Sequence, residues 1–315
     1  PLLENGKIVN ESKNKSNILN QHFASKSTVQ NSEDDVPFLP KQQGVPVVNS
    51  INTSPMEVLK IIRHHLKKSH LSHCGIPGKF LSLIATPISF SLSRLFNNLF
   101  EIGHYPDMWK ISHITAIYKH KGLKNDKVNY RPISLLPTLS KICESIIHHR
   151  LLGHCSENNI ISYRQAAYIK GDSTVSQLLY LVHKIKLAWT GKKVTHGVFL
   201  DVDGAFDKIW HKAIIAKLNS INIEGKLLDL FTSYLSNRQQ KTVVDGEKSN
   251  ITRTSAGLPQ GSRLGPLLFI IYINDITDIG LESEILIFAD DCSLIISDPD
   301  PQKTVEILNR DLGRI

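Results

Sequence analysis

The chain has 315 residues, and its 37 Lys and Arg against 29 Asp and Glu give it a net charge of +8. A hydrophobic share of 41% is enough for a buried core, and the length predicts one large domain or two modest ones. The basic balance favours a polyanionic partner such as nucleic acid, although a merely basic soluble protein would have the same composition.

Cysteine spacing and apolar runs exclude two further classes of protein. The four cysteines lie far apart without a C-x-x-C pair, which favours reduced thiols in an intracellular protein over a disulfide framework. His70, His73 and Cys74 lie close together, but no second ligand pair follows at zinc-finger spacing. The longest apolar run, Leu264–Ile273, is far shorter than the ~20 residues of a membrane span, so no membrane partner is expected.

The N-terminal part of the chain is predicted to be helical on both sides of a linker. Residues 1–23 predict a short helix, and the polar stretch 24–53, with its prolines, predicts a loop or linker. Ser54-Pro55-Met56-Glu57 then predicts a helix start, with Ser54 as the cap and Glu57 completing a capping box. Leu81–Phe100 predicts a further long helix. These patterns divide the chain into an extension and linker at 1–54, a helical region at 55–97 and a larger domain at 98–315.

Strands and helices alternate in the next part of the chain. Ile114–Tyr118 alternates like a strand and is followed by the basic stretch Lys119–Lys127. Two helices are then predicted, at Ser140–Leu152 and at Val175–Trp189. The chain stops at Ile315 inside a further predicted helix and begins without Met, so we expect a fragment of a longer polyprotein or a degraded copy.

A first candidate carboxylate is Asp201, which ends the predicted strand Val194–Leu200. A helix is predicted to follow, with Phe206 and Ala213 at its apolar face and Asp207 at its start, where a negative side chain is favoured for structural reasons. The carboxyl end of a strand beside a helix is a usual place for a functional carboxylate. Taken alone, this segment is better explained by an aspartate that caps a helix.

A second candidate site is sharper. Ile285–Ala289 and Ser293–Ser297 are apolar strands, and Asp290 and Asp291 lie between them at the tip of a predicted tight hairpin. Two adjacent anions beside apolar strands repel each other, and a divalent cation would remove that conflict. An exposed turn rich in Asp is the alternative. With Asp201, the pair could hold two Mg²⁺ ions roughly 3.5–4 Å apart, as two-metal phosphoryl chemistry requires.

Five segments in order resemble the motifs of reverse transcriptases. Phe288–Asp291 resembles the F/Y-x-D-D box, and Leu200–Asp207 resembles the first palm motif, D-x-x-x-A-F. Gly257–Ser262, followed by Leu264–Leu268, resembles the motif between these two. Asn129–Leu136 and Gly171–Thr174 resemble the fingers motifs of LINE-type (non-LTR) retrotransposons, most of all the jockey group.

The resemblance implies an α+β fold in which 98–315 is a right-hand polymerase domain. It would comprise fingers and palm, with an antiparallel palm sheet backed by helices and the thumb absent. The activity implied is RNA-directed DNA polymerisation, with an RNA template, a DNA primer, dNTPs and two Mg²⁺ ions, Mn²⁺ being an alternative.

The resemblance also implies residue roles. Asp201, Asp290 and Asp291 would be the metal-binding catalytic triad, and Phe206 would lie under the nucleotide sugar and exclude ribonucleotides. Residues that would shape the nucleotide and template site or bind the triphosphate are Gln260, Gly261, Arg131 and Lys141, with Arg164 or Lys170.

Several positions depart from the family pattern. Asp203 adds a carboxylate that could compete for metal, and Cys292 follows the Asp pair where Thr is frequent. Ala166, Ala167 and Ile169 stand where many relatives have Phe, Gly and Arg, so one fingers cation is missing. These departures leave a second hypothesis open, an inactive nucleic-acid-binding remnant of a decayed transposon copy. A two-metal nuclease would need further Glu, Asp and His clusters, which the sequence does not contain.

Overall fold

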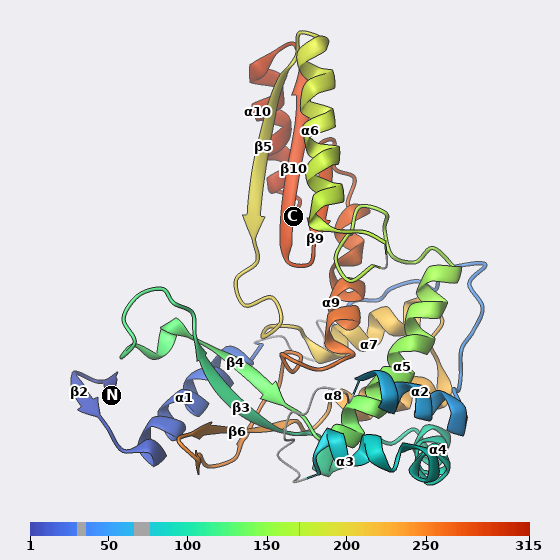
Figure 1. Ribbon diagram of the computed structural model, residues 1–315. Helices are drawn as coiled ribbons and strands as arrows, with labels where there is room; N and C mark the ends of the chain where they lie inside the picture. Colours follow the sequence, from blue (N-terminus) through green and yellow to red (C-terminus); the bar gives the residue numbers. More distant parts are fainter. Residues whose placement is uncertain (30–35, 66–75, 170) are drawn as a thin grey trace. The chain divides into compact units, whose positions relative to one another are not determined.

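The computed structural model describes residues 1–29, 36–65, 76–169 and 171–315, which form mixed helices and sheets in two compact units (Figure 1). Unit 1 comprises Pro1–His154 and Phe206–Gly265, and unit 2 comprises Cys155–Ala205 and Pro266–Ile315. The α+β class is therefore confirmed. His70, His73, Cys74 and Lys170 lie outside the described residues.

The sheet of unit 1 is built around β3 (Ile111–Tyr118), the predicted strand at 114–118. It pairs antiparallel with β4 (Tyr130–Leu135) and parallel with β6 (Gln239–Val244). Two short strands, β7 (Glu247–Lys248) and β8 (Thr252–Arg253), pair with β6.

The N-terminus differs from the helix predicted over 1–23. The structure has a hairpin of β1 (Leu2–Glu4) and β2 (Lys7–Val9), and only then α1 (Ser12–Lys26). The hairpin turns at Asn5 and Gly6, both with positive φ, the dipeptide and conformation of a tight type I′ turn. Side chains of α1 pack with Leu2 of the hairpin and with the sheet, in a buried cluster of Leu2, Leu19, Phe23 and Ile114.

Helices make up the rest of unit 1. The predicted start at Pro55 is confirmed, because the Ser54 hydroxyl accepts the Glu57 N–H at 3.2 Å. The Glu57 carboxylate does not close a capping box, since it pairs with Arg150 at 2.7 Å and with Thr53. The predicted helix over 81–100 is broken at Ile84 into two helices. The helices wholly within unit 1 after α1 are α2 (Pro55–His65), α3 (Gly78–Leu83), α4 (Ala85–Ile102), α7 (His211–Ser220) and α8 (Gly225–Leu235).

A buried carboxylate fixes the longest helix, α5 (Thr138–Glu157), which contains the predicted helix at 140–152. Glu144 is fully buried and accepts hydrogen bonds from the Ser140 hydroxyl at 2.9 Å and the Tyr105 hydroxyl at 3.3 Å. It also accepts the N–H of Arg263 at 2.8 Å and of Leu264 at 3.3 Å. Burial, with the charge of Glu144, raises the pKa of Tyr105 well above its usual value, so the phenol stays a neutral donor. The loop leading into α9 (Gly265–Ile273) is thereby tied to α5.

The sheet of unit 2 is antiparallel, in the order β5-β10-β9. Its strands are β5 (Val194–Asp201), β9 (Glu284–Phe288) and β10 (Asp291–Asp298), which confirms the three predicted strands. One face carries the core, where Ile285, Ile287, Cys292 and Leu294 pack with Leu308 of α10 (Pro301–Leu312).

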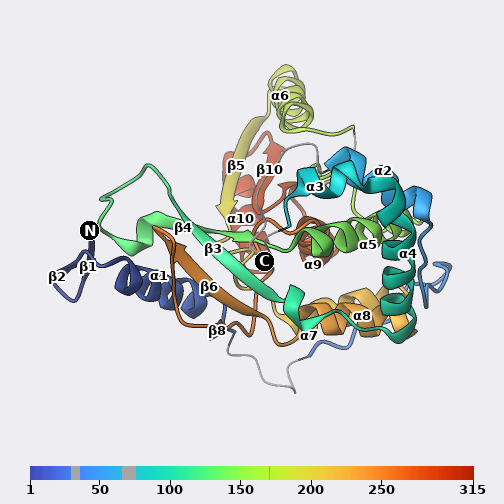
Figure 2. The same cartoon turned by 60° about the horizontal axis from the view of Figure 1, so that its bottom comes forward.

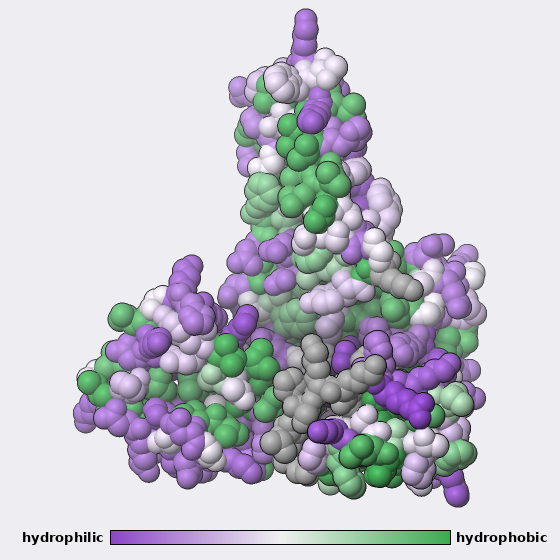
Figure 3. Space-filling view, viewed as in Figure 1, coloured by the Kyte–Doolittle hydropathy of each residue, from purple (hydrophilic) through white to green (hydrophobic). Residues whose placement is uncertain are grey.

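The opposite face of this sheet meets α6 (Thr174–Thr190), the predicted helix at 175–189. Glu284 of β9 forms an ion pair with Lys184 at 2.9 Å and accepts a hydrogen bond from the Tyr180 hydroxyl. Figure 2 shows the strands between α6 and α10. The α6 helix exposes apolar side chains, including Leu179 and Trp189. A green, hydrophobic area is seen over this part of the molecule in Figure 3. The core of unit 2 therefore lies on the α10 side of its sheet.

A helix directly after Asp201 is not formed, which corrects the prediction. The chain makes turns over 203–207, and α7 begins only at His211. The cause is tertiary: the carbonyl of Phe206 accepts the N–H of Leu258, and that of Ile209 accepts the N–H of Gly257, each at 2.8 Å. The 206–209 backbone thus pairs with a distant loop instead of with itself, and neither Phe206 nor Asp207 lies on a helix.

The C-terminal helix is held by a second buried carboxylate. Asp311 is fully buried and accepts the N–H and hydroxyl of Ser283 at 2.7 and 2.6 Å and the N–H of Glu282 at 3.1 Å. Burial raises the pKa of Asp311, but these hydrogen bonds outweigh it and hold the pKa below its usual value.

Within the described ranges, no helix is long and apolar enough to cross a membrane.

Asp311→Asn should lower the free energy of unfolding at neutral pH by about 1.5–3 kcal/mol, because hydrogen bonds to a charged acceptor are lost. Since the pKa is lowered in the folded state, this contribution is present above about pH 4 and lost as the pH falls through the folded pKa. Wild type and variant should therefore converge in acid-titrated denaturation curves. The matched control is Glu306→Gln, which removes an exposed carboxylate from the same helix. A difference that does not depend on pH would contradict the prediction.

Gly261→Ala should lower the free energy of unfolding of unit 1 by more than the positive φ of this residue alone explains. A Cβ at Gly261 would lie 2.9 Å from the Ser134 carbonyl oxygen, and φ there is +110°. Gly246→Ala is the control, because φ is +85° but no described atom lies within 4 Å of the added Cβ. We expect a loss of about 1 kcal/mol for the control and about 1–3 kcal/mol more for Gly261→Ala. Equal losses in chemical denaturation would show that the close approach is unimportant.

Candidate active site

The register of β5 and β10 brings two of the predicted carboxylates together. Asp201 is the direct antiparallel partner of Asp291, although ninety positions of sequence separate them. Side chains of directly opposed residues point to the same face, with Cβ atoms about 4.5–5.5 Å apart. Both aspartates are exposed, and the next pair, Leu200 with Cys292, points to the core face. The structure thus places the two carboxylates side by side at one end of the sheet.

Asp290 lies in the two-residue turn between β9 and β10, next to Asp291 in sequence. Its preceding residue, Ala289, is buried and has φ +56°. Burial raises the pKa of Tyr168, and the negative charge of Asp290 raises it further. The sequence contained no signal for this neighbour. All three predicted carboxylates therefore come from the β5–β10–β9 sheet and its turn.

Cys292 has a structural explanation. Burial raises the pKa of its thiol to about 11, and the charges of Asp291 and Asp290 add to the shift. The thiol is protonated at neutral pH and packs in the core. The described cysteines, Cys143, Cys155 and Cys292, are free and buried.

The donor set at this turn fits Mg²⁺ in its chemistry. Carboxylate oxygens are hard ligands, and Mg²⁺ commonly uses only one or two of them, with water and substrate phosphates completing its shell. Among the residues with described positions, no three or more His, Cys, Asp or Glu side chains form a group that could hold a metal ion, so the structure does not gather the three predicted aspartates into one metal site. The pair that it does bring together is Asp201 with Asp291.

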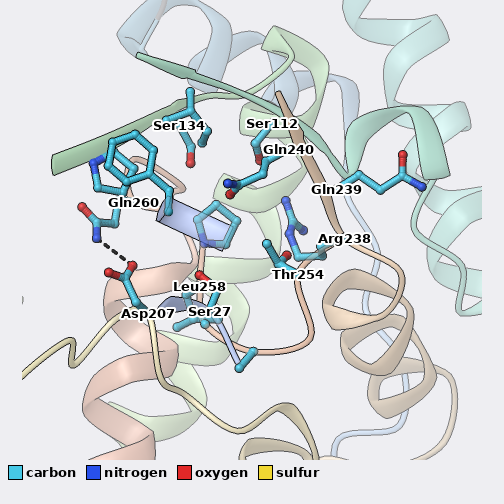
Figure 4. Close-up of a pocket in the computed structure, with 16 residues that line it drawn as sticks. Ser27, Ser112, Ser134, Asp207, Arg238, Gln239, Gln240, Thr254, Leu258 and Gln260 are labelled. Atoms are coloured by element: carbon cyan, nitrogen blue, oxygen red, sulfur yellow. Dashed lines mark hydrogen bonds between the residues drawn. The ribbon is translucent and has the colours of Figure 1, made fainter. Parts of the chain in front are cut away.

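The loop before α9 carries Gln260 and Gly261 in unit 1 (Figure 4). The Gln260 amide donates to the Asp207 carboxylate at 2.9 Å, and the Gln260 carbonyl accepts the Ser134 N–H at 2.7 Å. These bonds join the loop to β4 and to Asp207. The predicted structural role of Asp207 at a helix start is thus replaced by a contact with Gln260.

The other candidate residues divide between the two units. Phe206 is half-buried, Arg131 is exposed on β4, and Lys141 is half-buried; all three belong to unit 1. Burial lowers the pKa of Lys141, although Glu144 opposes the shift. Arg164, in unit 2, donates to the Ile285 carbonyl at 3.1 Å and pairs with Glu284, so it holds β9. The structure thus brings Asp201 together with Asp291 in unit 2, and Gln260 together with Asp207 in unit 1.

Comparison with known proteins identifies the family. Residues 119–312 match the model of the family described as reverse transcriptase (RNA-dependent DNA polymerase). A probable RNA-directed DNA polymerase from transposon X-element of Drosophila melanogaster is 31% identical over 75% of this chain and 26% of that protein. The RNA-directed DNA polymerase from mobile element jockey of the same species is 34% identical over 65% of this chain and 23% of that protein.

The chain spans about a quarter of the length of these two relatives. The family match, by contrast, covers more than half of the chain and contains all three candidate aspartates. The chain therefore belongs to the reverse transcriptase family, and its relatives are the RNA-directed DNA polymerases of non-LTR retrotransposons of the jockey kind.

Proposed function

We propose that this domain catalyses RNA-directed DNA synthesis by two-metal nucleotidyl transfer, with Asp201, Asp290 and Asp291 as the metal ligands. The observation that carries the proposal is the β5–β10 register, which pairs Asp201 with Asp291 one residue beyond Asp290. Exposed carboxylates on adjacent strands repel each other unless a cation lies between them. The arrangement is therefore suited to an ion.

Mg²⁺ ions bound there, or Mn²⁺ in their place, would lower the pKa of a primer 3′-hydroxyl and neutralise charge on the leaving pyrophosphate. Asp201 and Asp291 are exposed at one end of the sheet, so their carboxylates would be available to hold such ions. Cys292, protonated and buried behind them, adds neither a ligand nor a charge. The chain's own contribution is thus a fixed set of oxygen donors on a rigid sheet.

We propose a matching division of the chain. The β5–β10–β9 sheet, with α6 and α10, would form the palm, and the β4–β3–β6 sheet would belong to the fingers. Residues 98–315 would form the polymerase domain, after an extension at 1–54 and a helical region at 55–97. An RNA template, a DNA primer and dNTPs are the proposed partners, with Arg131 and Lys141, and Lys170, as candidate phosphate contacts and Gln260 and Gly261 shaping the nucleotide site.

Asp201→Asn, Asp290→Asn and Asp291→Asn should each reduce primer extension on an RNA template with Mg²⁺ by about a hundredfold or more, because a charge that stabilises the transition state is removed. RNA binding should change little. Asp298→Asn, at the far end of the same strand β10, is the control and should retain activity. Retained extension in Asp290→Asn would refute the proposal. RNA binding without extension even in wild type would identify an inactive remnant.

Phe206→Val should admit ribonucleotides with little loss of dNTP incorporation, because we propose that this ring crowds a 2′-hydroxyl. The control is Phe231→Val, a buried residue of α8, which should leave a cavity costing about 1–4 kcal/mol and keep the sugar preference. Incorporation efficiencies for dNTP and rNTP, with thermal unfolding, separate the two roles. An unchanged sugar preference with reduced stability would make Phe206 a packing residue.

A further inference from the structure

The loop 162–167 is attached to the strand that leads into the Asp290 turn. Gln165 and Ile287 of β9 form a parallel β-bridge. The N–H of Ala166 donates to the Ile287 carbonyl, and the N–H of Ile287 donates to the Arg164 carbonyl, each at 3.0 Å. The other end of the loop is held where the Ser162 N–H donates to the Asn274 side chain at 2.8 Å. The loop therefore has a defined position beside β9, within unit 2.

The side chain of Gln165 reaches the turn itself. Its Oε1 accepts the N–H of Ala289 at 3.0 Å and the N–H of Ala167 at 2.9 Å. Gln165 is only 4% exposed and Ala289 only 6%, so water cannot readily replace these bonds. Ala289 directly precedes Asp290. The Gln165 carbonyl is thus bonded to the backbone one residue before the first aspartate of the pair.

Ala289 needs such a support. Its φ is +56°, whereas Asp290 has no positive φ, a pattern in which two-residue hairpin turns favour glycine at the first position. An alanine there is strained by its Cβ, and strained residues persist only where the surrounding structure fixes them. Gln165 supplies a fixed acceptor to this residue, so the shape of the turn depends on a side chain 124 positions away.

A second unfavourable feature lies in the Gln165 side chain itself. Gln165 Nε2 is buried and has no hydrogen-bond partner among the residues that the structure describes. An unpaired buried amide is destabilising, and such groups call for an explanation in function. A glutamate would accept the same two N–H groups without an orphan donor, but it would add a charge beside Asp290 and Asp291. A glutamine therefore suits a site that must hold an acceptor while keeping its charge for the metal ligands.

We propose that Gln165 is a positioning residue for nucleotidyl transfer: its side-chain carbonyl fixes Ala289 and so holds the turn that carries Asp290 and leads into Asp291, the strand partner of Asp201. The proposal rests on the metal-binding role proposed above for the aspartates. Gln165 acts through the backbone of Ala289 and touches neither substrate nor metal.

The test uses the 315-residue chain with three substitutions at Gln165. Gln165→Met removes the acceptor, Gln165→Asn shortens the side chain by one methylene, and Gln165→Glu keeps the acceptor. Gln177→Met is the matched control, because Gln177 donates to the carbonyl of Arg164 in the same loop at 3.0 Å and to the carbonyl of Ile287 in β9 at 2.7 Å. Measurements are kcat and KM for dNTP, Mn²⁺ affinity from the electron paramagnetic resonance of free Mn²⁺, and thermal unfolding.

We expect Gln165→Met to lower kcat by about tenfold to a hundredfold with little change in KM, because a small misplacement of reacting groups is costly. Mn²⁺ should bind about tenfold more weakly, as when the support of a metal ligand is lost. Gln165→Asn should behave alike, and it provides the test if Gln165→Met does not fold. Gln165→Glu should bind Mn²⁺ about as tightly as wild type, because it keeps the acceptor. Gln177→Met should change thermal stability alone.

Wild-type kcat and Mn²⁺ affinity in Gln165→Met or Gln165→Asn would overturn the proposal, as would equal losses in Gln177→Met or no recovery in Gln165→Glu. Asp290→Asn separates this failure from a failure of the proposed function. If Asp290→Asn loses Mn²⁺ binding while Gln165→Met keeps it, only the role of Gln165 is wrong. If Asp290→Asn binds Mn²⁺ like wild type, the metal site itself is wrong and both proposals fall.

Discussion

The pairing register of β5 with β10 is the constraint on which the candidate site depends. Strand side chains alternate between faces, so a slip of one residue would exchange the buried and exposed sets of one strand. Leu200 opposite Cys292 and Val198 opposite Leu294 must face the core, and this requirement puts Asp201 and Asp291 on the other face. The burial of an apolar face, and no attraction between the aspartates themselves, therefore determines that these two like charges lie opposite each other.

Carboxylates serve two opposite purposes in this chain, and burial with hydrogen bonding distinguishes them. Glu144 and Asp311 are fully buried, and each accepts several N–H and O–H donors, so each ties a helix to a distant backbone segment. Asp201 and Asp291 are exposed at a strand end. A buried, fully bonded carboxylate is a structural anchor, whereas exposed carboxylates held side by side by backbone pairing are available to a cation.

Sequence patterns sufficed where the determining interactions are local. The alternation in 194–200, and the apolar runs 285–289 and 293–297 on either side of the Asp pair, predicted the strands and the Asp290 turn, which the structure confirms. Asn5-Gly6 was an available hairpin signal that the helix prediction at 1–23 overlooked. No local signal existed for the break after Asp201, because the 206–209 carbonyls bond to the loop at 257–258. Nor could spacing have found Glu144 or Gln165, each of which accepts a backbone N–H from more than a hundred residues away.

Two of the three departures from the family pattern that follow Gln165, Ala166 and Ala167, have little effect on the bonds that support the Asp290 turn. Ala166 and Ala167 are nearly fully buried, and both contribute backbone N–H groups, one to Ile287 and one to Gln165. Changes of side chain at these positions leave such bonds intact, because the backbone makes them. Ile169 differs, since the resemblance leads us to expect a cation at this position, and no backbone group can supply that charge. The support of the aspartates is therefore independent of these two alanines, and a loss of function through this loop would have to come from weaker binding of an anionic substrate.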